Sequence, residues 1–358
     1  MDLQVILPDN IDDPQSPSGG NRYDRELCSG LVTQGWRVHE HPAYGAWPRP
    51  TTADLAALNA ILAGVPDDAP VLVDGLIASC APTVLTTHAY RLRLVLLVHM
   101  PFGDTDPSAR RPEAAALRTA RAIVATGEWT RRHLTALYDL PTDRVRVATP
   151  GVAPAELSTG PEASFLCVGV VAPHKGHDVL VEALAQVADL PWTCVCAGAI
   201  DRDAPFVETL GARIEEYHIG NRLRLEGPRV GAELDGLYAG AGLLVHPSRG
   251  ETYGMVAAEA LARGIPVLAT TAKGLPEAVG RAPDGAVPGF LIPPDDPAAL
   301  AAALRNWLTD PPLRARLRAA ARARRDTLTD WSVTTRQVSD TLRNLPANPI
   351  GDDYSVTH

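Results

Sequence analysis

Short apolar runs alternate with amphipathic segments of helical length along almost the whole chain. A strand of a parallel sheet is buried on both faces and reads as such a run, and the helix after it covers one face of the sheet. In the first part of the chain we predict strands at 3–7, 37–41, 71–74, 92–99, 123–126 and 145–148, and helices at 22–34, 53–63, 112–121 and 128–138. This alternation predicts a doubly wound α/β sheet.

A stretch rich in proline and glycine, 149–161, interrupts the alternation, which then starts again. A chain of 358 residues is longer than a domain with one hydrophobic core usually is, so we expect two domains, at 1–153 and 154–329. We expect the tail at 346–358 to be frayed. The second series predicts strands at 163–170, 193–197, 223–227, 243–246, 267–270 and 289–292, and helices at 177–187, 205–217, 232–239, 297–308, 312–326 and 331–345.

Charge and composition argue against several classes of protein. A nucleic-acid binder is not expected, because 33 basic residues stand against 42 acidic ones and the net charge is −9. The first strand begins without a basic leader and no apolar run reaches the length of a membrane span, so we expect a cytoplasmic protein without a transmembrane segment. The five cysteines are odd in number, scattered and mostly embedded in apolar segments, which predicts core thiols. Cys194 and Cys196 would share one face of a strand, but without a second pair or a clustered histidine no metal site is expected.

The stretch 247–269 combines a strand end, a helix start and two carboxylates. The apolar run 243–246 is broken by Pro-Ser-Arg-Gly, and a helix follows from Met255. The first amides of a helix lack partners inside the helix and carry the positive end of its dipole, so they can hold a diphosphate. Glu251 precedes this helix and Glu259 lies inside it, so the two carboxylates can accept hydrogen bonds from different hydroxyls of one ligand.

This stretch resembles the Glu-x7-Glu signature of the retaining family-4 glycosyltransferases. The resemblance implies the GT-B architecture, an α/β fold in which two Rossmann-like doubly wound domains face each other across a cleft and a terminal helix, here 330–345, crosses back to the first domain. It also implies that Glu251 lies by the donor sugar and that Glu259 binds the ribose hydroxyls of the nucleotide. The backbone amides that it implies for sugar and phosphate belong to Thr252, Tyr253, Gly254, Met255 and Val256.

Two further candidate motifs follow predicted strands of the first domain, where parallel sheets bind their ligands. Gly19 and Gly20 precede a helix that Asn21 can cap, and glycines at such a turn let a ligand approach the backbone. The family has a glycine-rich loop here that faces the donor diphosphate and the acceptor. His99 ends an apolar strand and resembles the family's histidine near the donor sugar, which implies a hydrogen bond to a sugar hydroxyl or a role in orienting the reaction.

Lys175 and Gly176 follow the first strand of the second domain and match part of the family's Gly-Arg-x4-Lys-Gly stretch. The resemblance implies that the Lys175 ammonium neutralises charge on the leaving diphosphate. The sequence departs from the pattern at Val170, where many members carry an arginine that shares the diphosphate. Either Lys175 and backbone amides hold the donor alone, or a substitute comes from His174, Arg249 or Arg22.

Arg229 and Val230 lie in a strand-to-helix loop where the family holds the nucleobase, and Gly198 and Ala199 end a neighbouring strand. Backbone groups carry much of this contact in the family, so the resemblance implies a base-binding role for this loop. An ordinary loop between a strand and a helix has a similar composition. The sequence therefore leaves open whether this loop binds the base or only connects the two elements.

The function that the resemblance implies is transfer of a hexosyl unit, with retention, from a nucleoside diphosphate sugar to an acceptor hydroxyl. A UDP-sugar is the first expectation for the donor, a soluble small molecule for the acceptor, and no cofactor is expected. Two alternatives stay open: a sugar phosphorylase or nucleotide-sugar hydrolase on the same fold, and a non-catalytic protein that binds sugar nucleotides. A nicotinamide oxidoreductase is disfavoured because no strand is followed by Gly-x-Gly-x-x-Gly.

Overall fold

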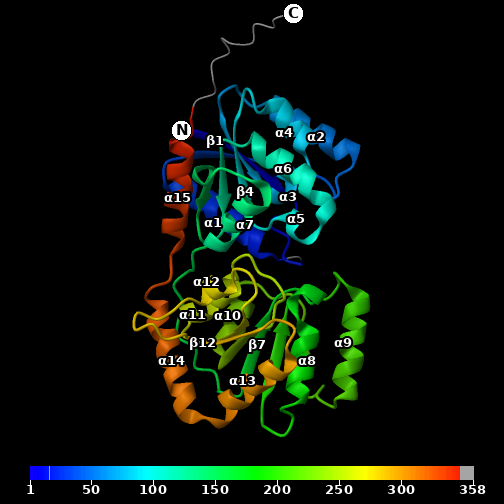
Figure 1. Ribbon diagram of the computed structural model, residues 1–358, viewed down its shortest axis with the longest axis vertical. Helices are drawn as coiled ribbons and strands as arrows, with labels where there is room; N and C mark the ends of the chain where they lie inside the picture. The colour runs from blue at the N-terminus through cyan, green and yellow to red at the C-terminus, as the bar shows by residue number, and fades with distance from the viewer. Residues whose placement is uncertain (16, 347–358) are drawn as a thin grey trace, which may run out of the picture. The chain divides into compact units, whose positions relative to one another are not determined.

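The computed structural model describes residues 1–15 and 17–346. The chain forms two compact units (Figure 1). The first unit comprises Met1–Asp12, Gly20–Thr149 and the chain from Trp331 onward, and the second comprises Asp13–Gly19 and Pro150–Asp330. The predicted frayed tail, apart from Pro346, lies outside the described residues.

The first unit contains a six-stranded sheet in the order β2-β1-β3-β4-β5-β6, and every strand pair in it is parallel. The strands are β1 (Asp2–Pro8), β2 (Arg37–Ala43), β3 (Pro70–Asp74), β4 (Arg93–Val98), β5 (Ala122–Ala125) and β6 (Val145–Val147). The helices are α1 (Gly19–Thr33), α2 (Thr52–Ala63), α3 (Gly75–Ala78), α4 (Pro82–His88), α5 (Phe102–Thr105), α6 (Arg110–Thr119), α7 (Glu128–Tyr138) and α15 (Trp331–Arg343).

Strand β4 explains why the apolar runs lack a polar face. Leu94 and Leu96 point into one hydrophobic cluster, while Val95 and Leu97 point into another on the opposite face of the sheet. Side chains alternate along a strand, so a strand covered by helices on both sides must be apolar at every position.

The last helix, α15, packs against the cluster beneath β1. Val338 and Leu342 are buried in that cluster together with Leu3. The indole nitrogen of Trp36 donates a hydrogen bond of 2.9 Å to the Ser339 hydroxyl. The C-terminal helix is therefore part of the first unit, although 181 residues of the second unit, Pro150–Asp330, precede it in the chain.

The second unit contains another parallel six-stranded sheet, in the order β12-β11-β10-β7-β8-β9. Its strands are β7 (Ser164–Val168), β8 (Thr193–Ala197), β9 (Leu223–Leu225), β10 (Leu243–His246), β11 (Val267–Thr270) and β12 (Gly289–Ile292). Its helices are α8 (His177–Ala185), α9 (Ala204–Glu216), α10 (Gly231–Ala239), α11 (Met255–Ala262), α12 (Leu275–Val279), α13 (Pro297–Thr309) and α14 (Pro311–Arg325).

Two kinds of prediction differ from this fold. Helix α1 begins at Gly19, so Asn21 lies inside its first turn and does not cap it, and Gly20 does not have the left-handed backbone of a glycine turn. The short helices α3, α4, α5 and α12 were not predicted, because four to seven residues are too few to show a helical period. No helix in the described part of the chain has both the length and the apolar character needed to cross a bilayer.

The strand order reverses at one place in each sheet. In the first sheet this place lies between the neighbours β1 and β3, because β2 follows β1 toward one edge of the sheet and β4 follows β3 toward the other. In the second sheet it lies between β7 and β10, which are followed by β8 and β11 on opposite sides. Ligands of open α/β sheets bind beyond the carboxyl ends of the strands at such a switch point. The segments that follow β7 and β10 carry Lys175 and Glu251, and those around β1 and β3 carry Gly20 and Asp74.

Candidate functional site

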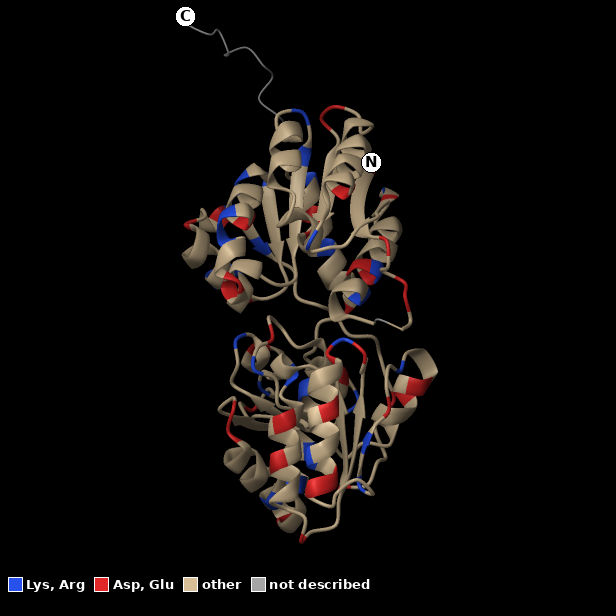
Figure 2. Ribbon diagram, turned by 90° about the vertical axis from the view of Figure 1, so that its right-hand side faces the viewer, with Lys and Arg blue, Asp and Glu red and all other residues tan. Residues whose placement is uncertain are grey.

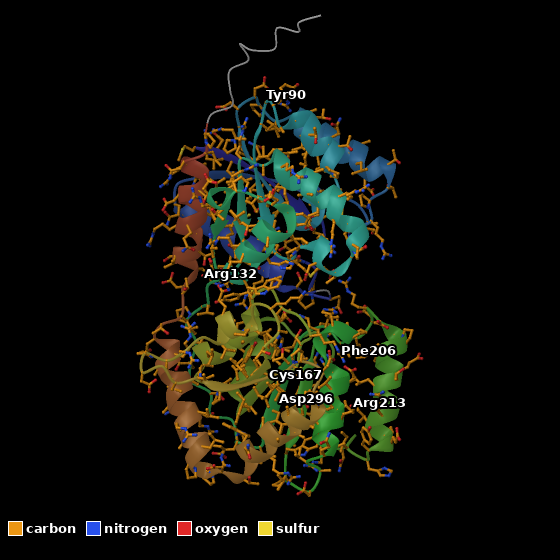
Figure 3. The ribbon with its side chains drawn as sticks, in the orientation of Figure 1. Tyr90, Arg132, Cys167, Phe206, Arg213 and Asp296 are labelled. Atoms are coloured by element: carbon orange, nitrogen blue, oxygen red, sulfur yellow. The ribbon has the colours of Figure 1, made fainter. Side chains whose placement is uncertain are left out.

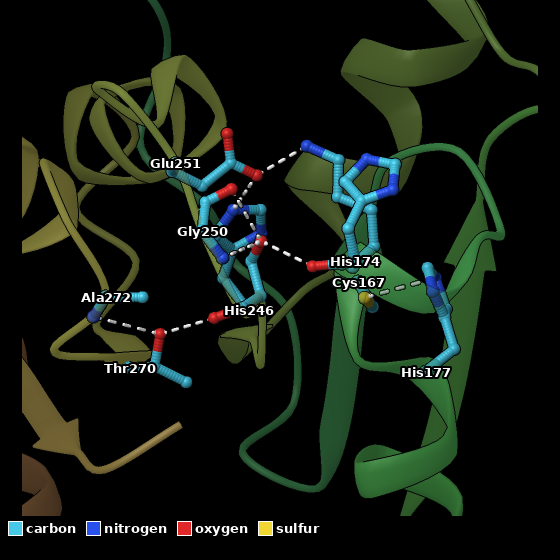
Figure 4. Close-up of polar contacts among 10 residues, drawn as sticks. Cys167, His174, His177, His246, Gly250, Glu251, Thr270 and Ala272 are labelled. Atoms are coloured by element: carbon cyan, nitrogen blue, oxygen red, sulfur yellow. Dashed lines mark hydrogen bonds and ion pairs between the residues drawn. The ribbon is translucent and has the colours of Figure 1, made fainter. Parts of the chain in front are cut away.

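The switch point of the second sheet brings together Lys175, Glu251 and His246 (Figure 4). Lys175 ends a short 3-10 turn after β7, and its ammonium donates to the Glu251 carboxylate. His246 is the last residue of β10, and its Nε2 lies 3.1 Å from the same oxygen of Glu251. The predicted lysine and glutamate are therefore partners, and the histidine was not predicted from the sequence.

The charge of this cluster is fixed by its surroundings. Burial alone would raise the pKa of Glu251, but the Lys175 charge and the contact with His246 hold that pKa well below its usual range. Only 15% of the Glu251 side chain and 20% of the Lys175 side chain are exposed. The carboxylate therefore stays anionic at neutral pH and holds the ammonium at the carboxyl edge of the sheet.

Gly176 allows the loops after β7 and β10 to meet. Its φ of 72° is left-handed, and a Cβ at this position would lie 2.1 Å from the carbonyl oxygen of Pro247. Any side chain would therefore push the two loops apart and separate Lys175 from Glu251. The role of Gly176 that the structure shows is the close contact of two backbones.

The start of α11 presents backbone groups, while its side chains are largely packed inward. Gly254 precedes the helix with a φ of 102°, and a Cβ there would lie 2.6 Å from Leu275 Cδ2. The side chain of Tyr253 is buried in the hydrophobic cluster that contains the apolar residues of α11. Thr252, Met255 and Val256 complete the predicted amide segment around this helix start.

Glu259 lies in the second turn of α11 and is 8% exposed. The Tyr238 hydroxyl donates a hydrogen bond of 2.8 Å to Glu259 Oε2. Tyr238 comes from α10, and its spacing from Glu259 gave no signal in the sequence because only packing of two helices brings them together. The predicted ribose-binding carboxylate is thus oriented by a buried phenol.

The loop predicted to hold the base lies at the edge of the second sheet. Val230 is 43% exposed just before α10, and Arg229 is 3.7 Å from Glu226 in an ion pair. The amide of Gly198 donates to the carbonyl of Gly227 at 2.8 Å, which ties together the loops after β8 and β9. Strand β8 separates β9 from β7, so Arg229 and Val230 lie two strands away from the strand that precedes Lys175.

The structure does not support two of the substitutes considered for an arginine at Val170, Arg249 and His174. Arg249 donates to both oxygens of Asp178, at 2.9 and 2.8 Å, and also pairs with Asp295, so its charge is already neutralised. Burial lowers the pKa of His174 and the neighbouring Lys175 lowers it further, so His174 is neutral at pH 7. Arg22 belongs to the first unit.

In the first unit, His99 lies against Gly20 and two buried carboxyl groups. His99 Nε2 is 2.8 Å from Asp24 Oδ1 and 3.5 Å from Asp74 Oδ2, and both acids are at most 5% exposed. A Cβ on Gly20 would approach His99 Cδ2 to 3.3 Å, which explains a glycine at this position. Gly19, at the boundary of the units, begins the same helix. Neither acid was predicted from the sequence, although Asp74 ends the apolar strand β3.

These acids raise the pKa of the imidazole. Burial alone would lower the pKa of His99, but the charge and hydrogen bond of Asp24, with the contact to Asp74, raise it to about 10. We expect the His99 ring to keep its proton well past pH 8 when the side-chain nitrogens are followed by ¹⁵N NMR. Its stabilising contribution is complete below pH 6.5, the unperturbed value, and is lost as the pH rises through about 10.

His88 serves as an internal control for this titration, because burial and the nearby Arg91 lower its pKa below 6.5. Asp24→Asn should shift the His99 midpoint to lower pH and leave that of His88 unchanged. A wild-type His99 midpoint between pH 6 and 7 would contradict the assignment.

A buried group of thiols lies within the second unit. Cys167 Sγ is 3.7 Å from His177 Nε2 (Figure 4). The ligand atoms of these two residues and Cys196 lie within 4.8 Å of one another. The prediction that no histidine clusters with Cys194 and Cys196 was therefore wrong for Cys196. The strand register places Cys196 beside Cys167, and α8 begins at His177. The contact with the Cys196 thiol and burial raise the pKa of Cys167 well above its usual value, so the Cys167 thiol stays protonated at neutral pH.

Comparison with known proteins agrees with the geometry. The sequence profile of the family "Glycosyl transferases group 1" matches residues 154–324. D-inositol 3-phosphate glycosyltransferase 1 of Catenulispora acidiphila is 32% identical over 334 residues, with 83% of this chain and 77% of that protein covered. The D-inositol 3-phosphate glycosyltransferase of Thermobispora bispora is 31% identical over 281 residues, and the match covers 72% of this chain and 64% of that protein.

Solved structures share the fold at low sequence identity. Sucrose-phosphate synthase from Thermosynechococcus elongatus superimposes with a TM-score of 0.77 at 22% identity, over 96% of this chain and 99% of that one. Anabaena HepE, crystallised with UDP-glucose, gives a TM-score of 0.76 at 19% identity, over 96% of this chain and all of that one. The chain is therefore an enzyme of the group 1 glycosyltransferases, the family-4 type with the GT-B architecture.

Proposed function

We propose that the protein transfers a hexosyl unit from a nucleoside diphosphate sugar, with retention at the anomeric carbon, to a hydroxyl of a soluble small molecule. The observation that carries the proposal is the Lys175–Glu251–His246 cluster at the switch point of the second sheet. A UDP-sugar is the first donor to test, since HepE was crystallised with UDP-glucose on the same fold. The relatives named for D-inositol 3-phosphate support a small hydroxylated acceptor.

The chemistry follows from where charge develops. When the bond between the anomeric carbon and the β-phosphate oxygen breaks, negative charge grows on the diphosphate. The Lys175 ammonium and the amides before α11 would stabilise that charge, and Glu251 would accept a hydrogen bond from the sugar while it orients Lys175. In a retaining transfer the acceptor hydroxyl attacks from the face that the diphosphate leaves, and a phosphate oxygen takes its proton.

His99 would act as a hydrogen-bond donor and not as a general base. Its pKa of about 10 means that the ring is a cation at neutral pH and has no lone pair to accept a proton. A cationic donor next to Gly20 suits a sugar hydroxyl or a phosphate oxygen.

The proposal is tested by a binding screen followed by a turnover assay. The full chain is titrated with UDP, GDP, ADP and dTDP and with their glucose conjugates by thermal shift and calorimetry. The bound donor is then incubated with small polyols, sugars, inositol phosphates and aromatic alcohols, and the anomeric configuration of the product is read by NMR. Absence of binding to every nucleotide would contradict the proposal.

Two other outcomes separate the alternatives. Release of sugar 1-phosphate that requires inorganic phosphate would identify a phosphorylase. Tight binding of a nucleotide sugar without transfer or hydrolysis would identify a binding protein.

A further inference from the structure

Only two of the 33 basic residues in the sequence are lysines, Lys175 and Lys273, and the other 31 are arginines. An ammonium is a compact point charge with three donors, whereas a guanidinium is a planar fork, so the two are not interchangeable at a site that contacts phosphate. Both lysines lie at the carboxyl edge of the second sheet, Lys175 after β7 and Lys273 after β11. Elsewhere in both units the basic residues, all of them arginines, are interspersed with acidic ones (Figure 2).

The side chain of Lys273 lies against the backbone that leads into Glu251. A Cβ on Gly250 would be 3.0 Å from Lys273 Cε and 3.3 Å from its Nζ, so the absence of a side chain at Gly250 makes room for the lysine. Lys175 has a similar relation to Gly169, where a Cβ would lie 3.7 Å from Lys175 Cδ. The two lysine stems therefore pass over glycines in the loops on either side of the switch point.

The loop that carries Lys273 is fixed to the same segment. The amide of Gly274 donates to the carbonyl of Glu251 at 2.7 Å, and a Cβ on Gly274 would lie 2.0 Å from the carbonyl oxygen of Thr252. Lys273 itself has a left-handed φ of 50°. A glycine would adopt this backbone without strain, so the lysine at this position costs some stability.

We propose that Lys273 is the second cation of the donor diphosphate site and replaces the arginine that many members of the family carry at the position of Val170. Lys175 reaches the site from β7 and Lys273 from β11, on the two sides of β10 and Glu251. This assignment rests on the proposed function, because it names a residue that binds the diphosphate of that donor.

The test compares three substitutions at Lys273 with one matched control. Lys273→Gly removes the charge and the backbone strain together, Lys273→Met removes the charge alone, and Lys273→Arg keeps a charge. His218→Gly is the control, because His218 is exposed after α9 and has a similar left-handed φ of 55°. Calorimetry measures affinity for whichever of UDP, GDP, ADP or dTDP the wild type binds, and for the matching nucleoside without phosphates.

The expected result separates charge from folding. Lys273→Gly and Lys273→Met should weaken nucleoside diphosphate binding by about 10- to 100-fold, the usual worth of a hydrogen bond to a charged group, and leave nucleoside binding within about 2-fold. Lys273→Arg should recover most of the loss. Lys273→Gly should melt at the same temperature as the wild type or higher, and so should His218→Gly, whose diphosphate affinity should not change.

A second readout does not depend on substitution. Reductive ¹³C-methylation labels only the two lysines and the N-terminal amine, so the spectrum contains three kinds of signal. Addition of the nucleoside diphosphate should shift both lysine signals and leave that of the terminus unchanged.

Two outcomes would overturn the inference in distinguishable ways. Wild-type binding that falls with Lys175→Met but stays within 3-fold with Lys273→Gly and Lys273→Met would reject Lys273 and leave the proposed function standing. A wild type that binds none of the four nucleotides would reject both.

Discussion

Replacement of Lys175 by methionine is expected to lower kcat/KM for sugar transfer by about 10²- to 10³-fold, the usual loss when one preorganised donor to a developing anion is removed. Methionine keeps a stem of similar length and removes the charge. The leaving diphosphate then loses its cation, and the buried Glu251 loses the partner that keeps its pKa low. Initial rates with the identified donor measure the effect, and most of it should fall on kcat.

The control for this variant removes a cation from another ion pair in the same unit. Arg213 on α9 pairs with Glu182 at 2.6 Å, and both side chains are more than a third exposed (Figure 3). Arg213→Met should change kcat/KM by less than 2-fold, because an exposed pair contributes little. Equal losses in the two variants, or Lys175→Met within 3-fold of the wild type, would show that Lys175 does not bind the leaving group.

Much of the fold could be predicted from the sequence because its strands are buried on both faces. The predicted bounds of strand β10 and helix α7 are correct, because the apolar residues of each element follow one unbroken pattern along the sequence. Contacts that depend on topology were not predictable in this way. Lys175 and Glu251 are 76 positions apart, and they meet only because β7 and β10 are neighbours in the sheet.

The residues missed at the site have a common physical reason. Asp24 and Tyr238 each lie on the inner face of a helix, where the sequence pattern favours apolar residues, and the partner of each comes from another element. The proposed site residue Lys273 lies in a loop, and the left-handed backbone at this position gives no periodic signal in the sequence. Motif spacing therefore predicted candidate residues next to strand ends, and it gave no signal for the groups that contact them.

The second large effect is expected at Glu113, a carboxylate with no exposed surface in the core of the first unit. It accepts hydrogen bonds from the Ser79 hydroxyl at 2.9 Å, from the amides of Phe102 and Gly103 at 3.0 and 2.8 Å, and from the Tyr138 hydroxyl. Those amides begin α5, so this one side chain anchors the segment that follows His99.

Glu113→Gln should lower the free energy of unfolding of the first unit by about 3–5 kcal/mol. The amide keeps one acceptor oxygen and turns an NH₂ group toward donors, so buried N–H and O–H groups lose their partner. Urea titration of the full chain, read by hydrogen exchange of peptides from β4 and α6, assigns the loss to this unit. Glu128→Gln, which breaks an exposed pair with Arg131, should cost less than about 1 kcal/mol. If the two variants unfold at the same urea concentration, Glu113 does not anchor the segment after His99.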